Sequence, residues 1–587
     1  TPDAEGAWTY RVESWSDPYA TWRHAAEIKI PAEIDVELMF TEGGLVLTRA
    51  GEGIPATTRE GKAARTTLDA AVAAGRDDKR PPQVRLAALT SPEVRSALHR
   101  FPLRDLLSSE GPFPVYVDRV RALYGSWYEF FPRSEGALYD EATGTWRSGT
   151  FATAAKRIQA VADMGFDVLY LPPVHPIGEV NRKGPNNTLT PGEADPGSPW
   201  AIGSKDGGHD AIHAELGTID DFDDFVAQAS AAGLEVALDF ALQCAPDHPW
   251  VSAHPEWFTT RADGTIAYAE NPPKKYQDIY PLNFDNDYQG LRSEVLRVLR
   301  YWMDHGVRIF RVDNPHTKPV RFWEWLFAEV RRTDPDVVFL SEAFTRPYMM
   351  RGLGMVGFHQ SYTYFTWRNT KPELESYLSE VSHETDALMR PNFFVNTPDI
   401  LPAFLQYGGP AAFKIRAAIA ATGSPSWGVY AGFELFEHVA VRPGSEEYLD
   451  SEKYQFRPRD WAAAEAEGRT LAPYITRLNG IRRRHRALQL LRNVTIHRTE
   501  EDAVLCYSKR ASIADSDDAV IVVVNLDPHG TRETVVHLTM PALGFDWHET
   551  FLVVDEITGE SWRWGEHNYV RLDPFQEPAH ILSVRRP

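Results

Sequence analysis

The stretch from residue 306 to residue 342 constrains the fold more than any other part of the chain. Two short apolar runs, 306–312 and 337–340, enclose one amphipathic segment. A strand, a helix and a second strand in this order predict the βαβ unit of a parallel sheet. The carboxyl ends of both strands then lie at one edge of the sheet, where the chain places Asp313 and Glu342.

Two carboxylates at neighbouring strand ends allow two interpretations. Glycosidic bond chemistry needs such a pair, because one carboxylate attacks the sugar and the other transfers protons. The pair is also consistent with ordinary charged residues that happen to end two strands. The sequence around the pair favours catalysis.

Apolar runs alternate with helical patterns from about residue 116 to residue 495. About eight strands separated by helices predict a catalytic (β/α)₈ barrel of the α/β class. A doubly wound sheet is the alternative, but candidate polar residues recur at many strand ends, which favours the barrel. Residues 176–216 contain several Gly and Pro without periodicity and predict an inserted loop subdomain. The expected strands are 123–131, 167–171, 234–240, 306–312, 337–341, 357–362, 392–395 and 427–430.

Three further regions flank this barrel. Residues 1–30 contain two predicted strands, 5–15 and 27–30, which cannot form a stable sheet alone. We interpret them as the remnant of an N-terminal β-sandwich or as strands that lean on the next domain. Residues 31–115 are predicted to be helical and to serve in packing or dimerisation. Residues 496–587 alternate short apolar runs with turn residues, which predicts a C-terminal antiparallel β-sandwich.

Composition excludes several classes of partner. The net charge of −21 argues against nucleic acid, and no apolar stretch long enough to span a membrane is visible, so we expect no membrane partner and a cytoplasmic location. The two cysteines, Cys244 and Cys506, indicate no disulfide framework, and Cys244 is interpreted as a small apolar filler. His175, His209 and His248 show no known ligand spacing, so we predict no metal and no cofactor.

Four short runs resemble the signatures of the α-amylase superfamily, in the right order on a barrel pattern that a β-sandwich follows. By that resemblance Asp313 is the nucleophile, Glu342 the general acid/base and Asp399 the carboxylate that stabilises the transition state. Arg311 would keep the nucleophile ionised, and Asp239 would support the site. The four runs are 237–239, 310–314, 340–343 and 394–399.

These roles agree with physical expectation. Asp313 must stay anionic, and the guanidinium of Arg311 projects from the same face of the strand. Glu342 must hold a proton until it reaches the leaving oxygen, which requires poor solvation or nearby negative charge. Retention of anomeric configuration requires carboxyl groups about 5 Å apart, which adjacent strands can provide.

Departures from the amylase pattern narrow the resemblance. Typical amylases carry Asn-His after the first of these carboxylates, often linked to a calcium ion, and a His directly before the last. Here Phe follows Asp239 and Pro398 precedes Asp399, so starch hydrolysis is disfavoured and no amylase calcium site is expected. With the runs 239–250 and 271–280, the departures resemble the bacterial α-1,4-glucan:maltose-1-phosphate maltosyltransferases over essentially the whole chain. That family has an N-terminal β-domain, so we expect this chain to be shortened at its front.

The resemblance assigns further binding residues. A phosphate dianion in an acidic protein needs a fixed cation and hydrogen-bond donors, although a Lys pair in a turn is also consistent with plain solvated surface. Ser198 would lie near the end of the maltosyl pocket. The donor phosphate would contact Asn271, Lys274, Tyr276 and Asn314, and the second glucose would contact Lys183, Gln243, Lys453 and Tyr454.

The resemblance therefore implies a retaining transferase that acts as a homodimer. It would move maltosyl units from α-maltose 1-phosphate to the non-reducing end of an α-1,4-glucan through a β-maltosyl-enzyme, and it would release phosphate. The alternative is an amylase-like hydrolase or transglycosylase without a phosphate donor. A third hypothesis is an inactive barrel that serves only as a glucan-binding or assembly module, but such a module has no physical reason to keep three mutually repelling carboxylates.

Overall fold

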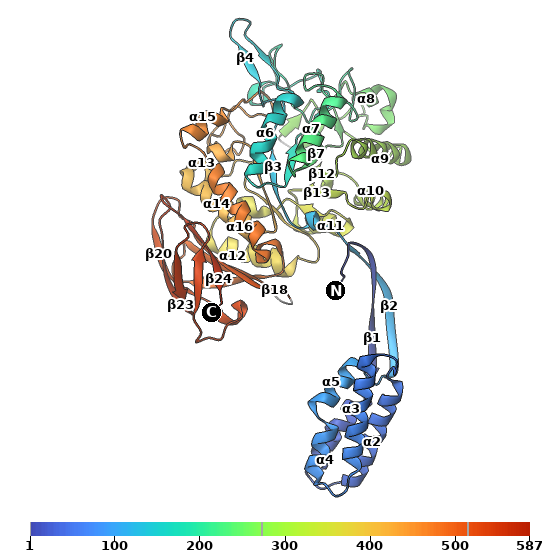
Figure 1. Ribbon diagram of the computed structural model, residues 1–587. Coiled ribbons are helices and arrows are strands. Elements are labelled where there is room, and N and C mark those ends of the chain that lie inside the picture. The colour runs from blue at the N-terminus through green and yellow to red at the C-terminus, as the bar shows by residue number, and fades with distance from the viewer. Residues whose placement is uncertain (1, 272–273, 514–515, 587) are drawn as a thin grey trace. The chain divides into compact units, whose positions relative to one another are not determined.

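The structure, a computed structural model, describes residues 2–271, 274–513 and 516–586 (Figure 1). The chain forms two compact units, residues 1–117 and 118–587. None of the helices in these described residues is long and apolar enough to cross a membrane.

The first unit joins a two-stranded antiparallel ribbon to a helical bundle. Strand β1 (Gly6–Ser16) pairs with β2 (Asp105–Val117), and five helices connect them. Trp22, Leu47 and Leu68 are buried in the core of the bundle. The helices are α1 (Pro18–Lys29), α2 (Val36–Gly53), α3 (Arg59–Arg76), α4 (Pro82–Leu89) and α5 (Pro92–Arg100).

The predicted strand at 27–30 is wrong, because these residues end or follow helix α1. The Asp17 side chain accepts a hydrogen bond from the Ala20 N–H and caps the helix, with Pro at its first position. The alternation of Ile28 and Ile30 suggested a strand, but in the helix Ile30 is buried and Ile28 exposed. Capping and core packing override the local pattern.

Strand β2 corrects a second expectation, since the helical region was predicted to reach residue 115. Gly111, Pro112 and Pro114 interrupt the apolar alternation of this strand, and such residues normally argue against a strand. The long register with β1, from Gly6 opposite Val117 onward, forms nevertheless. The sequence alone does not reveal this strand, because its partner β1 is separated from it along the chain by five helices.

Eight parallel strands form the barrel of the second unit, which confirms the (β/α)₈ prediction and rules out the doubly wound sheet. The Ser361 N–H donates to the Arg390 carbonyl at 2.9 Å and closes the barrel between its first and last strands in sheet order. In sheet order the strands are β14 (Gln360–Ser361), β13 (Val338–Glu342), β12 (Ile309–Asp313), β7 (Glu235–Phe240), β6 (Val168–Leu171), β3 (Gly125–Glu129), β16 (Ser426–Tyr430) and β15 (Asn392–Phe394).

Helices surround the strands (Figure 1); most of them are amphipathic, whereas α14 (Gly409–Gly423) is buried almost all round. Their buried residues and one face of the strands form a large apolar core, and the alternate residues of the strands, such as Trp127, Tyr170 and Phe394, form a separate apolar cluster. Both faces of the parallel sheet are therefore covered. These helices are α6 (Phe151–Asp163), α7 (Ile219–Ala231), α9 (Tyr288–Asp304), α10 (Val320–Thr333), α11 (Pro347–Val356), α12 (Lys371–Ser379), α14 (Gly409–Gly423) and α16 (Ala472–Arg484).

Long connections follow several strands at their carboxyl ends. The connection from β6 to α7 is mostly loop, with one short helix, η2 (Pro185–Asn187), and isolated bridges such as Ile177 with Ile202. Beyond β7 the chain forms two small strand pairs, and a hairpin follows β3. The small strands are β4 (Leu138–Asp140), β5 (Thr145–Arg147), β8 (Gln243–Cys244), β9 (Ala269–Asn271), β10 (Lys274–Tyr276) and β11 (Tyr280–Pro281).

The C-terminal region is antiparallel, as the sequence predicted. Strands β18 (Val504–Ile513) and β19 (Ser516–Asn525) lie at the centre of the sheet order, and apolar residues such as Val523 and Val536 fill the core. The remaining strands are β17 (Val494–Thr499), β20 (Arg532–His537), β21 (Phe551–Asp555), β22 (Ser561–Trp564), β23 (His567–Leu572) and β24 (Ala579–Arg585). The domain limits given by the sequence analysis stay predictions.

Candidate active site

The register of three neighbouring strands assembles four charged residues at one end of the barrel. Asp313 at the end of β12 lies opposite Glu342 at the end of β13, and Arg311 lies opposite Asp239 of β7. All four side chains are buried. We call Asp239, Arg311, Asp313 and Glu342 the strand-end cluster.

Arg311 holds the strand-end cluster together. One terminal nitrogen, Nη1, lies 2.8 Å from Asp239 Oδ2 and 2.9 Å from Asp313 Oδ1, and Nη2 lies 3.1 Å from Glu342 Oε1. Charge-assisted hydrogen bonds of this kind are short and directional. Because Asp313 and Glu342 contact the same guanidinium, their carboxyl groups are close together, as a retaining mechanism requires.

Burial and charge favour a protonated Glu342. Burial raises the pKa of Glu342, and the negative charges of Asp313, Asp399 and Asp239 raise it further, against the opposing effect of Arg311. Burial also raises the pKa of Asp239, whereas Arg311 and donated hydrogen bonds lower it. A carboxylic acid that keeps its proton at neutral pH can act as a general acid.

Asn314 connects the two central carboxylates. It follows β12 in a left-handed conformation, with φ of 42°, which is uncommon for a residue with a side chain. Its backbone N–H donates to Glu342 Oε2 at 3.3 Å, and its side-chain amide lies 3.4 Å from Asp313 Oδ2. The turn thus places a donor on each carboxylate.

Asp399 lies on the loop after β15 and comes from a different part of the barrel. Asn396 fixes this loop, since its Oδ1 accepts from the Tyr430 N–H at 2.9 Å and its amide donates to the Tyr448 hydroxyl at 2.9 Å. The Asp399 carboxylate forms an ion pair with Lys453. The sequence had assigned Lys453 to the second glucose, so this pairing adds a contact that the sequence did not predict.

Three residues assigned to the second glucose, Lys183, Lys453 and Tyr454, lie on two loops with Ser198, which was assigned to the end of the maltosyl pocket. We call Lys183, Ser198, Lys453 and Tyr454 the loop wall. Lys183 and Ser198 belong to the connection between β6 and α7 and are buried, as is Tyr454. Lys183 Nζ donates to Gln277 Oε1 at 3.0 Å. Gln243, also assigned to the second glucose, donates from Nε2 to the Trp200 carbonyl at 3.1 Å.

Hydrogen bonds across the loops hold the loop wall together. The buried Arg133 donates to the carbonyls of Gly197 at 2.9 Å and Glu452 at 2.8 Å. Farther out, Asn186 Nδ2 donates to Asp450 Oδ1 at 3.1 Å, and the Asp450 N–H donates back to Asn186 Oδ1 at 2.8 Å. These bonds bring segments more than 250 residues apart onto one side of the site.

The structure describes the side chains of only some of the residues assigned to the phosphate. The backbones of Asn271 and Lys274 pair between β9 and β10, but their side chains lie outside the described residues. Tyr276 is half-buried; burial raises the pKa of its hydroxyl, and the charges of Lys453 and Asp399 also act on it. The structure therefore places Tyr276 and Asn314 near the carboxylates.

Three site residues escaped the sequence analysis. The Tyr170 hydroxyl donates to Asp239 Oδ2 at 2.5 Å, and Trp200 Nε1 donates to the same oxygen at 3.2 Å. Glu129 ends β3 in a buried position, and burial raises its pKa. Tyr170 and Glu129 lie in predicted strands, and a polar side chain near the end of such a strand could have marked each of them as a candidate site residue. Trp200 lies in a loop without periodicity.

One buried group has the composition of a metal site. Ligand atoms of His209, Cys244 and His248 lie within 4.8 Å of one another. His209 Nε2 lies 2.9 Å from the Ala241 carbonyl and must carry a proton there, while His248 Nδ1 accepts from the Trp250 N–H at 3.0 Å. The neutral His248 therefore has its proton on Nε2, which donates to His209 Nδ1 at 3.1 Å. Because this proton occupies the position of a metal, we assign no ion to the group.

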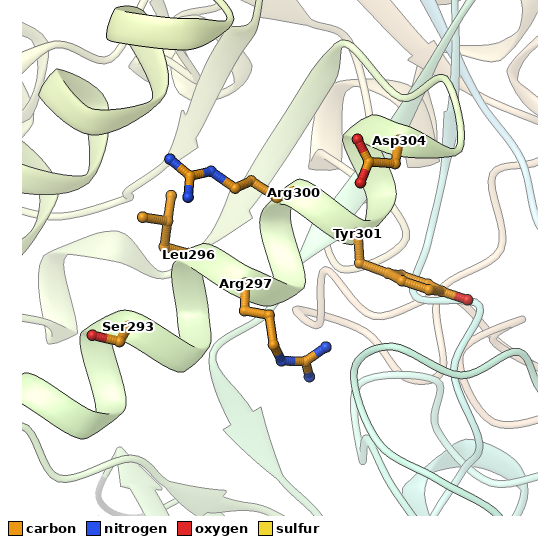
Figure 2. Close-up of a pocket in the computed structure, with 6 residues that line it drawn as sticks. All are labelled: Ser293, Leu296, Arg297, Arg300, Tyr301 and Asp304. Atoms are coloured by element: carbon orange, nitrogen blue, oxygen red, sulfur yellow. The ribbon is translucent and has the colours of Figure 1, made fainter.

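A surface hollow on the outside of the barrel is a poor candidate for a binding site. Figure 2 shows that all its lining side chains project from the single helix α9. None of them belongs to the residues assigned above. The hollow is lined by Ser293, Leu296, Arg297, Arg300, Tyr301 and Asp304.

The barrel has the (β/α)₈ fold that α-amylases also have. A maltogenic α-amylase of Thermotoga neapolitana superposes with a TM-score of 0.60 at 19% identity, over 80% of this chain and 99% of that one. An α-amylase of Lactobacillus plantarum superposes with a TM-score of 0.59 at 20% identity, over 79% of this chain and 100% of that one. These neighbours show the fold.

Sequence comparison identifies the family within that class. Residues 1–119 match the family model "Alpha-1,4-glucan:maltose-1-phosphate maltosyltransferase, domain N/S", and residues 496–584 match "GLGE, C-terminal". The chain is 60% identical to α-1,4-glucan:maltose-1-phosphate maltosyltransferase 2 of Streptomyces coelicolor, over all of this chain and 86% of the relative. It is 55% identical to the Mycobacterium tuberculosis enzyme, over all of this chain and 82% of that protein. The chain belongs to the α-1,4-glucan:maltose-1-phosphate maltosyltransferase family.

Proposed function

We propose that this protein transfers maltosyl units from α-maltose 1-phosphate to the non-reducing end of an α-1,4-glucan, with retention of configuration. In the first step Asp313 attacks the anomeric carbon and the bond to the phosphate oxygen breaks. The electron pair goes to phosphate, and Glu342 supplies the proton. A β-maltosyl ester of Asp313 remains.

The second step reverses the roles at the same carbon. The 4-hydroxyl of the acceptor attacks the ester, Glu342 takes its proton, and Asp313 leaves as the carboxylate. Asp399 stabilises the positive charge that develops on the sugar ring in both steps. The chain grows by two glucose units, and inorganic phosphate is the other product.

The observation that carries this proposal is the single guanidinium of Arg311, which contacts both Asp313 and Glu342. The contact holds the two carboxyl groups side by side, and burial raises the pKa of Glu342, which favours its protonated form. A carboxyl group in the position of the nucleophile thus lies beside one that is suited to donate a proton. Full-length identity of 60% to a maltosyltransferase supports the choice of donor.

The test is to measure phosphate release from α-maltose 1-phosphate with and without maltohexaose, following product lengths by mass spectrometry. We expect phosphate release that depends on the acceptor and products that grow in steps of two glucose units. Shortened or reshuffled glucans without phosphate release would instead support the amylase-like alternative. No maltosyl-enzyme and no turnover would support the inactive barrel.

Lys274 provides a second test of the phosphate donor. If its ammonium binds the donor phosphate, Lys274→Ala should greatly reduce phosphate release. A neutral-glucan enzyme should tolerate the same change. Lys205→Ala is a matched control, because the Lys205 side chain is 76% exposed, lies 3.9 Å from Glu179 and has no assigned role.

The assembly we propose is a homodimer. The ribbon of β1 and β2 exposes apolar side chains, including Leu106, which is 89% exposed, and an isolated two-stranded ribbon is marginally stable in water. A second copy would cover such a surface. Light scattering should give twice the mass of the chain, and Leu106→Lys with Val12→Lys should lower it; a wild-type monomer would refute the proposal.

A further inference from the structure

Lys318 lies over the turn that carries the proposed nucleophile, although the sequence analysis gave it no role. Its Nζ lies 3.5 Å from the Asp313 carbonyl and 3.3 Å from the Asn314 carbonyl. Thr317 Oγ1 donates to the Asn314 carbonyl at 2.7 Å and fixes the same turn. The ammonium is thus held by backbone oxygens next to the catalytic carboxylates.

The charge of Lys318 acts on the strand-end cluster. Lys318 is half-buried, and burial lowers the pKa of its ammonium, while Asp313, Glu342 and Asp239 oppose that shift. Arg311 and Lys453, by contrast, each form an ion pair with a carboxylate. Within the described part of the chain, Lys318 makes no such pair within 4 Å, so its charge is compensated only at longer range.

The position of Lys318 relative to Glu342 suggests which part of the donor it meets. The leaving oxygen must reach Glu342, because Glu342 supplies its proton. The Asn314 N–H lies 3.3 Å from Glu342 Oε2, and the Lys318 ammonium lies 3.3 Å from the carbonyl of that same residue. An ammonium has three donors, and two carbonyls leave one for a further acceptor.

We propose that Lys318 is a further binding residue for the phosphate group of the donor and for the phosphate product. This inference rests on the proposed function and deepens it. A phosphate dianion that enters a site with four carboxyl groups needs a cation that does not already form an ion pair with a carboxylate. Lys318 meets that requirement as a positive charge and exchanges no proton or electron, since the leaving oxygen receives its proton from Glu342.

The experiment compares two donors that differ only in the leaving group. Lys318→Met keeps the length of the side chain and removes its charge. With α-maltose 1-phosphate and maltohexaose, kcat/KM should fall roughly ten- to hundredfold, the loss expected for one hydrogen bond to a charged group. With α-maltosyl fluoride, which has no phosphate, kcat/KM should stay within about threefold of the wild type. The inhibition constant for inorganic phosphate should rise in parallel with the loss on the phosphate donor.

Two further variants separate binding from folding. Lys318→Arg keeps the charge and should retain most of the activity on the phosphate donor, whereas Lys205→Met should change neither reaction. Equal losses on both donors would assign Lys318 to the shape of the turn and overturn the proposal, as would no loss on either. A wild-type protein that uses the fluoride but never the phosphate would refute the proposed function instead.

Discussion

The strand-end cluster and the loop wall serve one site but are built in different ways. In the cluster, Asp313 is opposite Glu342 and Arg311 opposite Asp239 because the backbone register of parallel strands puts them there. In the loop wall, Lys183 and Lys453 come together through side-chain hydrogen bonds between distant loops, such as those of Arg133. The carboxylates proposed as nucleophile and proton donor are thus fixed by the sheet, and the residues proposed to bind the second glucose are fixed by loops.

This difference predicts a gradient of mutational effects. A sheet register cannot adjust to a lost charge, and in the cluster each carboxylate shares Arg311 with the others. Loops have alternative conformations and more exposed hydrogen bonds, which contribute less. Substitutions should therefore affect turnover in the cluster and binding in the loop wall.

The largest effect should come from Asp313→Asn, which removes the nucleophile and keeps its shape. We expect kcat to fall by about four orders of magnitude or more, the scale seen for essential catalytic groups. Mass spectrometry should detect no maltosyl-enzyme. A variant with more than a tenth of wild-type turnover and an unchanged circular dichroism spectrum would show that the cluster does not carry the reaction.

The next effect is the pH dependence set by Glu342. Its pKa is raised by burial, so the proton it donates is present below that pKa and is lost as the pH rises through it. We expect kcat/KM to fall about tenfold per pH unit on the alkaline side. Glu342→Gln should lose roughly 10²- to 10⁴-fold in activity and lack this alkaline decline. An identical decline in the variant would assign the titration to another group.

Lys453→Met should have a smaller effect, and on a different parameter. The substitution removes the ion pair with Asp399 and one assigned contact to the second glucose. We expect KM for α-maltose 1-phosphate to rise roughly tenfold, with a lesser fall in kcat, as for one lost charged hydrogen bond. A fall in kcat alone would place Lys453 with the reacting groups and weaken the contrast between the two regions.

The smallest effect should follow from Asn186→Ala. This removes both exposed hydrogen bonds to Asp450, each contributing about 0.5–1.5 kcal/mol. We expect KM to rise by less than about tenfold and kcat to stay unchanged. Asp450→Ala should have a smaller effect, because it removes only the bond to Oδ1 and leaves the Asp450 backbone N–H to donate to Asn186. The double variant should match Asn186→Ala, because that change alone already removes both bonds. Losses that add in the double variant would show that Asn186 and Asp450 act independently.

The strand pattern predicted that Asp313 and Glu342 lie together, because each ends an apolar run that can be recognised locally in the sequence. Asp239 and Arg311 were assigned to the site by the family resemblance. The sequence could not predict that Trp200 donates to Asp239, since Trp200 lies in a loop with no period and its partner is remote. Strand β2 escaped for the same reason, with Pro112 and Pro114 hiding its alternation. Local patterns predict elements, whereas contacts between distant loops depend on the finished fold.

The hydrogen bonds of Arg133 bear on the order in which the site is completed during synthesis. This residue follows the first barrel strand, yet one of its two acceptors is the Glu452 carbonyl, 319 residues farther along the chain. During synthesis at the ribosome, Asp313 and Glu342 are made well before the segment that completes the loop wall. A chain that ends before residue 452 would contain all eight barrel strands, Asp313 and Glu342, but would lack Lys453 and Tyr454. On the proposed function, such a chain could not bind the donor, so transfer would begin only after the loop that follows the barrel strands is complete.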